Sequence, residues 1–237
     1  KRIEQLQREF ISTVSHELRT PLTSISGALA LICSNVTGEV PEQMRELLQI
    51  AQQNSLRLSA LIDDLLDMDK LHAGKMRFEL LEQPLRPQLE TALQSNRSYA
   101  ERHGVQLQLG ECPQVQVRVD AMRLQQVLSN LLSNAAKFSP PGEHVELSAR
   151  LRDGQVRVSV RDRGPGISTD FRERVFQKFA QADSSDSRQQ GGTGLGLAIS
   201  KELMERMGGR IGFESELGHG ACFWFELPIA DQAKESP

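Results

Sequence analysis

An imidazole and a carboxylate stand side by side at His16 and Glu17, within the segment 14–21. An exposed neutral imidazole is a competent nucleophile toward phosphorus. A neighbouring carboxylate can hold the proton of the other ring nitrogen, which leaves a lone pair free to attack. Thr20, one helical turn further on, could hold a water molecule for the reverse hydrolysis. Taken alone, the pair also fits a surface histidine on a charged helix.

A second group combines amides with an ammonium group in the segment 130–138. On a helix, Asn130, Asn134 and Lys137 share one face. Such a row suits a magnesium ion that keeps water and phosphate oxygens as most of its ligands, with the lysine on the phosphates. The alternative is a solvated polar face. Asparagine is a poor helix former, however, so two asparagines on one face of a helix indicate a requirement other than helix formation.

Asp162 begins an Asp-x-Gly-x-Gly sequence that runs through Gly164 and Gly166 to Ile167. A carboxylate there can accept a hydrogen bond from an exocyclic amine such as that of adenine, while the glycines let the backbone approach a flat ring. Taken alone, the same sequence fits an ordinary turn.

The glycine-rich segment 191–197 opens a predicted helix and so aims backbone amides at a phosphate. It is not a Walker loop, because no Gly-Lys-Ser/Thr follows. By itself it indicates a flexible loop leading into a helix. The long polar loop 170–192 precedes it, with Phe171, Phe176 and Phe179 nearby, and together they predict a hinged lid with apolar anchors.

The bulk composition narrows the possible partners. A formal net charge of −3 gives no electrostatic case for nucleic acid or an anionic membrane surface as the main partner. The sequence shows no apolar run long enough to span a membrane and no signal peptide, so no direct membrane contact is expected. Three widely separated cysteines indicate a reduced, cytoplasmic compartment. The polar ends suggest a fragment of a larger protein, which could itself be membrane-anchored.

The N-terminal third predicts a helical hairpin. Apolar residues recur every three or four positions over 3–36, and a break at 37–41 contains residues that close one helix and open the next. The stripe of the second helix, predicted over 41–73, includes Asn54. A single antiparallel hairpin is too thin to bury both stripes. Residues 1–73 are therefore expected to form a homodimer with a four-helix bundle.

Helical geometry also predicts the direction of His16. At about 100° per residue it lies roughly 200° from Val14 and Leu18, and so points away from the bundle core. Polar residues at four-residue spacing share this outward row: Ser12, Thr20 and Ser24. Pro21 cannot donate to the carbonyl of Glu17, so the helix should kink there and form a hinge.

After Gly74 the helical period gives way to short alternating runs, so a second domain is placed at 75–230, with a polar tail at 231–237. Strands are predicted at 76–80, 105–109, 115–119, 145–151, 156–160, 210–215 and 221–227, and helices at 85–103, 121–138 and 193–207. Asp120 is a good N-cap for the helix at 121–138. This order predicts an α+β fold, a mixed sheet with helices on one face.

The order and spacing of these segments over 10–228 resemble the sensor histidine kinases of two-component signalling. Residues 10–25 resemble that family's phosphoacceptor box and 130–140 its asparagine box. The remaining boxes match 162–167, 171–179, 191–197 and 218–220. The resemblance implies a dimerisation and phosphotransfer domain at 1–73. It also implies an α/β sandwich at 75–230 that binds ATP, of the gyrase, Hsp90 and MutL type.

The resemblance also implies roles for single residues. His16 would be phosphorylated from ATP and would pass the phosphoryl group to an aspartate of a response regulator receiver domain. Glu17 would be the acid/base, and Thr20 would support phosphatase activity. Asn134 would bind Mg²⁺, and Asp162 would recognise adenine by a hydrogen bond. The other nucleotide-binding positions would be Asn130, Lys137, Phe138, Gly164, Gly166, Ile167, Gly192, Thr193, Gly194, Leu195, Gly196 and Leu197.

Two positions depart from the family pattern. Gln181 stands where many members have a phosphate-contacting arginine, and Ala221 stands where a serine or threonine is frequent. The segment 179–183 resembles the lid of hybrid kinases. We hypothesise that Arg188 supplies the missing charge, which normal autophosphorylation of an Arg188→Ala protein would disprove.

Other functions remain open from the sequence. The chain could act mainly as a phosphatase of a phosphorylated regulator, or as a nucleotide-sensing dimeric scaffold without chemistry. A gyrase-type or Hsp90-type ATPase would share the asparagine and glycine segments but has no use for His16 on a helical hairpin. The sequence leaves open the input signal, the identity of the regulator, and whether His16 is phosphorylated within its own chain or by the partner.

Overall fold

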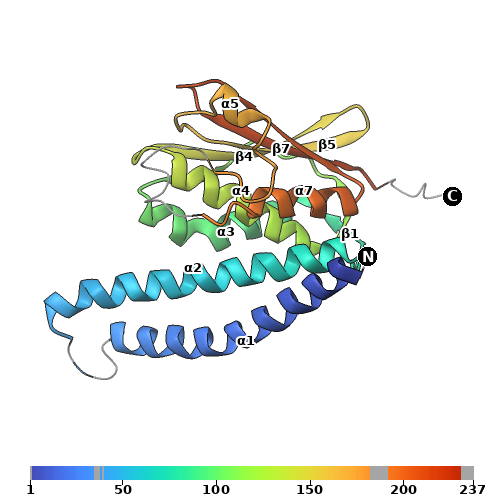
Figure 1. Ribbon diagram of the computed structural model, residues 1–237. Helices are drawn as coiled ribbons and strands as arrows, with labels where there is room; N and C mark the ends of the chain where they lie inside the picture. The colour runs from blue at the N-terminus through green and yellow to red at the C-terminus, as the bar shows by residue number, and fades with distance from the viewer. Residues whose placement is uncertain (1, 35–37, 39, 182–191, 231–237) are drawn as a thin grey trace. The chain divides into compact units, whose positions relative to one another are not determined.

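The structure, a computed structural model, describes residues 2–34, 38, 40–181 and 192–230; for residues 2–13 and His16 it describes the backbone alone. The chain divides into two compact units (Figure 1). The first comprises Lys1–Met76 with Asp183–Leu195, and the second comprises Arg77–Ala182 with Gly196–Pro237. The predicted polar tail at 231–237 lies outside the described residues.

The first unit is the predicted helical hairpin, formed by α1 (Arg2–Cys33) and α2 (Glu42–His72). A buried apolar cluster of Leu22, Ile62 and Leu66 joins the two helices. Polar residues share the seam, where the hydroxyls of Ser26 and Ser55 lie 2.7 Å apart. Pro21 lies inside α1, and Figure 1 shows that this helix bends along its length, as expected where proline removes a helical hydrogen bond.

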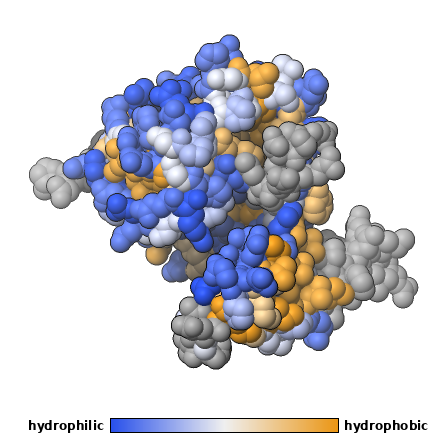
Figure 2. All heavy atoms as spheres, turned by 90° about the vertical axis from the view of Figure 1, so that its left-hand side faces the viewer, coloured by the Kyte–Doolittle hydropathy of each residue, from blue (hydrophilic) through white to orange (hydrophobic). Residues whose placement is uncertain are grey.

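Much of the apolar stripe predicted to face a bundle core lies on the surface of the single hairpin. Exposed members are Val14, Leu18, Ile25, Leu47 and Leu58, and the neighbouring Met44 and Ile50 are exposed as well. Figure 2 shows hydrophobic side chains gathered over the helices of the hairpin. Asn54 is exposed on the same stripe. Thr20 and Ser24 are exposed as predicted, whereas the side chains of Ser12 and His16 lie outside the described residues.

The second unit has a five-stranded sheet in the order β2-β4-β5-β7-β6. Its strands are β2 (Gln106–Leu109), β4 (His144–Arg152), β5 (Gln155–Arg161), β6 (Arg210–Ser215) and β7 (Ala221–Pro228). β2 and β4 are parallel and the other pairs are antiparallel. Figure 1 shows three helices along one face: α3 (Leu85–Arg102), α4 (Ala121–Phe138) and α7 (Gly196–Arg206). The predicted α+β sandwich is confirmed.

The inner face of the sheet carries the core. Alternate residues of β5, namely Val156, Val158 and Val160, are buried on the helix side, together with Phe225 of β7. Asp153 and Gly154, with φ of 49° and 76°, form a two-residue turn between β4 and β5. The turn sets the register that points the valines inward.

Three predicted boundaries are wrong. Residues 76–80 are not a strand; the first strand is β1 (Leu81–Pro84), which pairs with β3 (Gln116–Val119) in a separate two-stranded sheet. An alternating pattern becomes a strand only where a neighbour offers a ladder, and no described strand pairs with 76–80. α7 begins at Gly196 rather than at residue 193, and a short helix, α5 (Thr169–Arg172), lies in the predicted loop.

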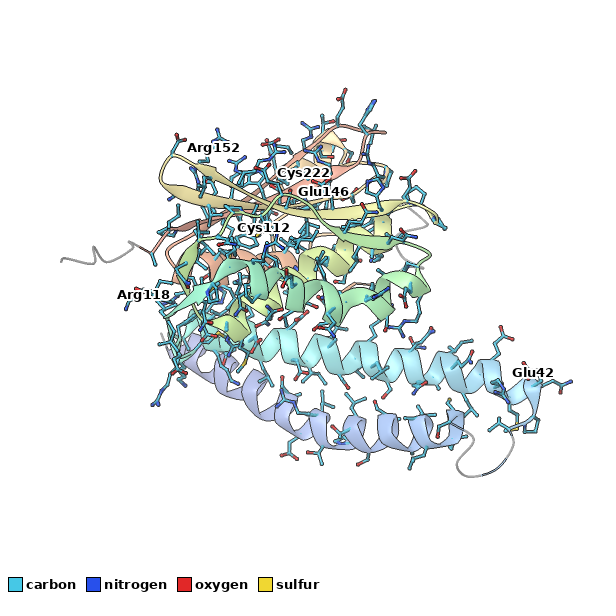
Figure 3. The ribbon with its side chains drawn as sticks, turned by 180° about the vertical axis from the view of Figure 1, so that it is seen from behind. Glu42, Cys112, Arg118, Glu146, Arg152 and Cys222 are labelled. Atoms are coloured by element: carbon cyan, nitrogen blue, oxygen red, sulfur yellow. The ribbon has the colours of Figure 1, made fainter. Side chains whose placement is uncertain are left out.

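Within the described ranges, no helix has the length and apolar character needed to cross a membrane. Cys33, Cys112 and Cys222 are free thiols. Figure 3 labels Cys112 in the loop before β3 and Cys222 on β7, on separate elements of the second unit.

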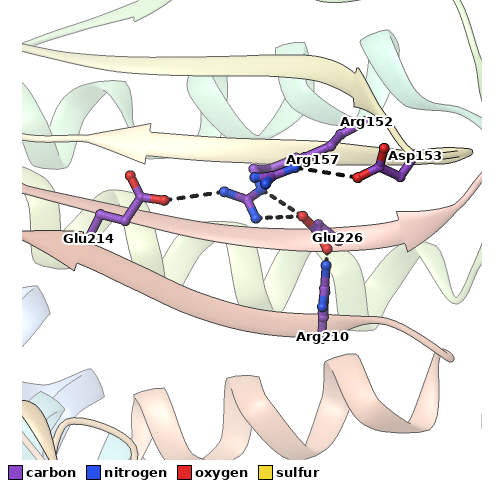
Figure 4. A network of polar contacts seen from close by, with 6 residues as sticks. All are labelled: Arg152, Asp153, Arg157, Arg210, Glu214 and Glu226. Carbon is purple, nitrogen blue, oxygen red and sulfur yellow. Dashed lines mark hydrogen bonds and ion pairs between the residues drawn. The ribbon is translucent and has the colours of Figure 1, made fainter.

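A charged network covers the outer face of the sheet (Figure 4). Glu226 of β7 is only 1% exposed because two arginines cover it. Arg157 Nη2 lies 2.6 Å from its Oε1, and the Nε of Arg210 contacts its Oε2. The Arg157 guanidinium also lies 3.9 Å from the ring centroid of Trp224. Burial raises the pKa of Glu226, but hydrogen bonds from Arg210 and Arg157, and then the charges of both, outweigh burial and hold this pKa below its ordinary value.

We expect Glu226→Gln to lower the free energy of unfolding of the second unit by about 2 kcal/mol, because an amide offers one acceptor oxygen in place of two and the negative charge that faces both arginines is lost. Trp224, the single tryptophan, reports unfolding by fluorescence. Because the pKa of Glu226 is lowered in the folded state, its ionised carboxylate stabilises the fold at pH values above the unfolded-state pKa. This stabilisation is lost as the pH falls through the folded-state pKa. Acid should therefore narrow the difference between wild type and variant.

Glu214→Gln is the matched control. Its side chain is 68% exposed and reaches Arg157 at 3.3 Å. Its removal should change stability by less than about 0.5 kcal/mol. Equal losses in the two variants would contradict this account of the network.

Candidate functional site

The asparagine row, defined as Asn130, Asn134 and Lys137, lies half-buried along α4. The opposite face of α4 is buried in the core through Leu124, Leu128, Leu131 and Leu132. Asn134 Nδ2 donates to Asn130 Oδ1 over 3.4 Å. The predicted shared face is therefore confirmed, and apolar burial on the other side of the helix fixes its direction.

The first residues of α7 meet this row. Asn130 Nδ2 donates to the hydroxyl of Ser200 over 3.0 Å. A Cβ added at Gly196 would lie 2.4 Å from Asn130 Oδ1, so only glycine admits the amide there. Ser200 was missed by the sequence reasoning. Its position four residues after Gly196 places both on one face of α7, which is the signal that could have found it.

Cations gather where α3 and α4 end. Lys137 Nζ lies 4.6 Å from the ring centroid of the exposed Phe138. Burial, followed by the charges of Arg102 and Lys137, lowers the pKa of His103, which follows α3. This end of the row is therefore electropositive, as an anion such as a phosphate requires. His103 gave no sequence signal, because only folding brings α3 beside α4.

Asp162 follows β5 and is only 6% exposed. Its Oδ1 accepts hydrogen bonds from the amides of Gly164, over 2.8 Å, and Ala221, over 3.0 Å. Burial raises the pKa of Asp162 against the opposing effect of these two amides. No described residue donates to Oδ2, so this oxygen can accept from a ligand amine. Ala221 therefore serves this site through its backbone.

The glycines around Asp162 are required by close backbone approaches. A Cβ at Gly164 would lie 2.7 Å from the carbonyl oxygen of Phe138, which joins this loop to the end of α4. Gly166 has φ of +75°, and a Cβ there would lie 2.2 Å from Glu216 O. The amide of Ile167 donates to the Ser215 hydroxyl over 2.9 Å. The structure thus brings the Asp162 loop and the asparagine row to one helix.

The remaining predicted positions are divided between the two units. Gly192, Thr193, Gly194 and Leu195 belong to the first unit, where Thr193 donates to Asp64 Oδ2 over 2.7 Å. Gly196 and Leu197 belong to the second unit. Glu17 and Thr20 are exposed on α1, which also contains the backbone of His16. Arg188 lies outside the described residues.

Two families match the chain. Residues 6–74 match the "His Kinase A (phospho-acceptor) domain", and residues 119–231 match the "Histidine kinase-, DNA gyrase B-, and HSP90-like ATPase". The chain belongs to the histidine kinases. The first match contains His16, Glu17 and Thr20, and the second contains the asparagine row, Asp162 and the glycine-rich segment.

Named histidine kinases are similar over most of this chain. The signal transduction histidine-protein kinase BarA of Escherichia coli is 37% identical over 95% of the chain and 25% of its own length. The sensor histidine kinase AruS of Pseudomonas aeruginosa is 40% identical over 96% of the chain and 23% of its own length. The chain thus spans about a quarter of these relatives.

A solved structure agrees with this relationship. The crystal structure of full-length ShkA in complex with AMPPNP is 35% identical, with a TM-score of 0.74, and covers 94% of this chain and 46% of its own. The predicted family and the predicted ATP-binding fold are confirmed. The roles of single residues in this histidine kinase stay predictions.

Gly196→Ala should weaken nucleotide binding about tenfold while leaving the fold intact. The added methyl group displaces the end of a flexible side chain, Asn130, which costs little stability but moves an amide of the row. Titration with a fluorescent ATP analogue measures the affinity. Gly27→Ala, at a helical glycine where a Cβ meets nothing within 4 Å, is the control and should bind normally. Unchanged affinity in Gly196→Ala would argue against this use of Asn130.

Proposed function

We propose that this chain uses ATP to phosphorylate His16 and passes the phosphoryl group to an aspartate of a response regulator receiver domain. The observation that carries the proposal is that a buried carboxylate lies in a loop that meets the end of the helix carrying the amide row. No described residue donates to the Oδ2 of Asp162, whose loop contacts the end of α4 at Phe138, and Asn130 and Asn134 lie along α4. The match of residues 6–74, which include His16, to a phospho-acceptor domain supports His16 as the nucleophile.

The proposed nucleotide contacts follow from this arrangement. Asp162 accepts from the exocyclic amine of adenine, and the loop of Gly164, Gly166 and Ile167 lies against the flat ring. The phosphates lie against the asparagine row, with Lys137 among their partners. Phe138 and the segment 192–197 complete the binding site.

The donor set fits a magnesium ion. Asn134 uses its Nδ2 toward Asn130, which leaves its carbonyl oxygen as a ligand. Mg²⁺ commonly takes one or two protein oxygens and fills its remaining positions with water and phosphate. When bound, it would neutralise charge on the phosphate oxygens.

The chemistry at His16 is an in-line displacement. One ring nitrogen forms a bond to the γ-phosphorus, the bond from that phosphorus to the bridging oxygen breaks, and ADP leaves. Glu17 holds the proton on the other ring nitrogen. Receiver-domain phosphorylation then transfers the group from nitrogen to a carboxylate oxygen. Thr20, exposed one turn away, would position water in the reverse, phosphatase reaction.

We also propose that residues 1–73 form a homodimer and residues 75–230 bind ATP. Support for the dimer comes from the exposed apolar stripe of the hairpin. An apolar face of this length is disfavoured in water and is expected to be covered by a second copy in a four-helix bundle.

Incubation with γ-labelled ATP tests the central proposal. Wild type should acquire an acid-labile, base-stable label, whereas His16→Ala and Asn134→Ala should lose it by more than a hundredfold. The two variants should lose the label for different reasons, because His16→Ala should still bind a fluorescent ATP analogue. Acid-stable label in His16→Ala would disprove the assignment, and nucleotide binding without any label in wild type would favour a scaffold.

Thr20→Ala should separate the kinase activity from the phosphatase activity. We expect labelling of His16 within about twofold of wild type and at least a tenfold slower dephosphorylation of the regulator, because the water-positioning hydroxyl is lost. The rate is measured with a phosphorylated receiver domain and ADP. Thr23→Ala is the matched control, since its hydroxyl is bonded to the carbonyl of Arg19 and should not serve a water. Equal effects of the two substitutions would remove the role of Thr20.

A further inference from the structure

Asp120 makes hydrogen bonds in two directions. Its Oδ1 accepts from the amide of Arg123 over 3.1 Å, and its carbonyl accepts from the amide of Leu124 over 2.9 Å, which caps α4. Its Oδ2 accepts from the amide of Glu79 over 3.0 Å. One carboxylate thus holds both the first turn of α4 and the chain segment that leads into the second unit.

The other end of this segment is fastened to α2. The amides of Lys75 and Met76 donate to the carbonyl of Lys70, over 2.9 and 3.2 Å. Between Met76 and Glu79, the residues Arg77 and Phe78 make no hydrogen bond with any residue the structure describes. Residues 73–76 are thus bonded to the end of α2, and the free part of the connector is 77–78.

The helix held by Asp120 is the helix that carries the asparagine row. The row begins ten residues after Asp120, and an α-helix transmits a displacement of its first turn rigidly over that distance. The same helix begins directly after β3, which also bonds a residue that follows β7, since the amide of Ala230 donates to Gln116 O over 2.9 Å. The segment that enters the unit and the residues after β7 are thus both hydrogen-bonded near the start of α4.

We propose that Asp120 is a positioning residue for phosphorylation of His16. By fastening Glu79 to α4, it confines the free connector to two residues and so sets how the bound nucleotide is presented to the histidine. The inference rests on the proposed function. It concerns the encounter of nucleotide and nucleophile rather than nucleotide binding itself.

Connector length gives the expected size of the effect. With the Asp120–Glu79 bond, the free stretch is residues 77–78. Without this bond, the free stretch is residues 77–80, because β1 begins at Leu81. Effective concentration falls roughly as the −3/2 power of linker length, so a doubling lowers it about threefold. Loss of orientation adds to this, because reacting atoms must meet in a defined geometry. We therefore expect a total loss of about three- to tenfold.

Asp120→Ser separates the two roles of this residue. Serine is a good N-cap and keeps the bond to Arg123, but it is too short and has too few acceptors to hold Glu79 as well. The labelling rate of His16 at saturating ATP should fall three- to tenfold, while affinity for a fluorescent ATP analogue stays within twofold. The thermal unfolding of the second unit, followed by Trp224 fluorescence, should be nearly unchanged.

Glu79→Pro removes the same hydrogen bond from the donor side, because proline has no amide hydrogen. It should reproduce the slower labelling. A double variant with both Asp120→Ser and Glu79→Pro should label no more slowly than either single variant. Glu79→Ala is the matched control: it loses the same side chain, keeps the amide and should label like wild type.

Wild-type labelling rates in both Asp120→Ser and Glu79→Pro would overturn the inference. So would a parallel loss of ATP affinity in Asp120→Ser, because that result would make the residue a structural cap only. Absence of label in the wild-type protein would instead overturn the proposed function and this inference with it, which distinguishes the two failures.

Discussion

The burial of one face of α4 is the constraint on which the rest of the site depends. Leu124, Val127, Leu128, Leu131 and Leu132 are almost fully removed from water. Each such side chain stabilises the fold by about 1.5–3 kcal/mol. A half-buried asparagine contributes far less, since a typical hydrogen bond adds about 1 kcal/mol. Apolar packing therefore decides the rotation of the helix, and the amides of Asn130 and Asn134 point where that rotation leaves them.

Backbone approaches then bring the other segments to this helix. Gly164 meets the carbonyl of Phe138, Gly196 meets the amide of Asn130, and Gly220 would place a Cβ 2.3 Å from Asp162 O. At each point a side chain would separate two segments that must touch. At these three glycines the missing side chain admits another part of the same chain.

Local structure could be predicted from the sequence, whereas contacts between residues distant in sequence could not. Periodicity predicted α2 and α4, and Asp120 was predicted as a cap, because each depends on neighbours within a few residues. The strand at 76–80 failed because ladder partners are distant in sequence. The partners of the predicted site residues, Ser200 for Asn130 and the amide of Ala221 for Asp162, are about 60 to 70 residues away, and no spacing rule reaches that far.

The two units differ in how they are stabilised, and this difference explains why a short connector matters. The second unit closes its own core between sheet and helices, whereas the hairpin places Ser15, Ser26 and Ser55 in its seam and leaves leucines outside. In the proposed homodimer, association of two copies would therefore set the packing of α1, independently of the nucleotide unit. The segment that follows α2 is one of the places where the chain passes from one unit to the other. With residues 75–76 bonded to α2 and residue 79 bonded to Asp120, a change in helix packing would reach α4 through two free residues rather than dissipate in a long linker.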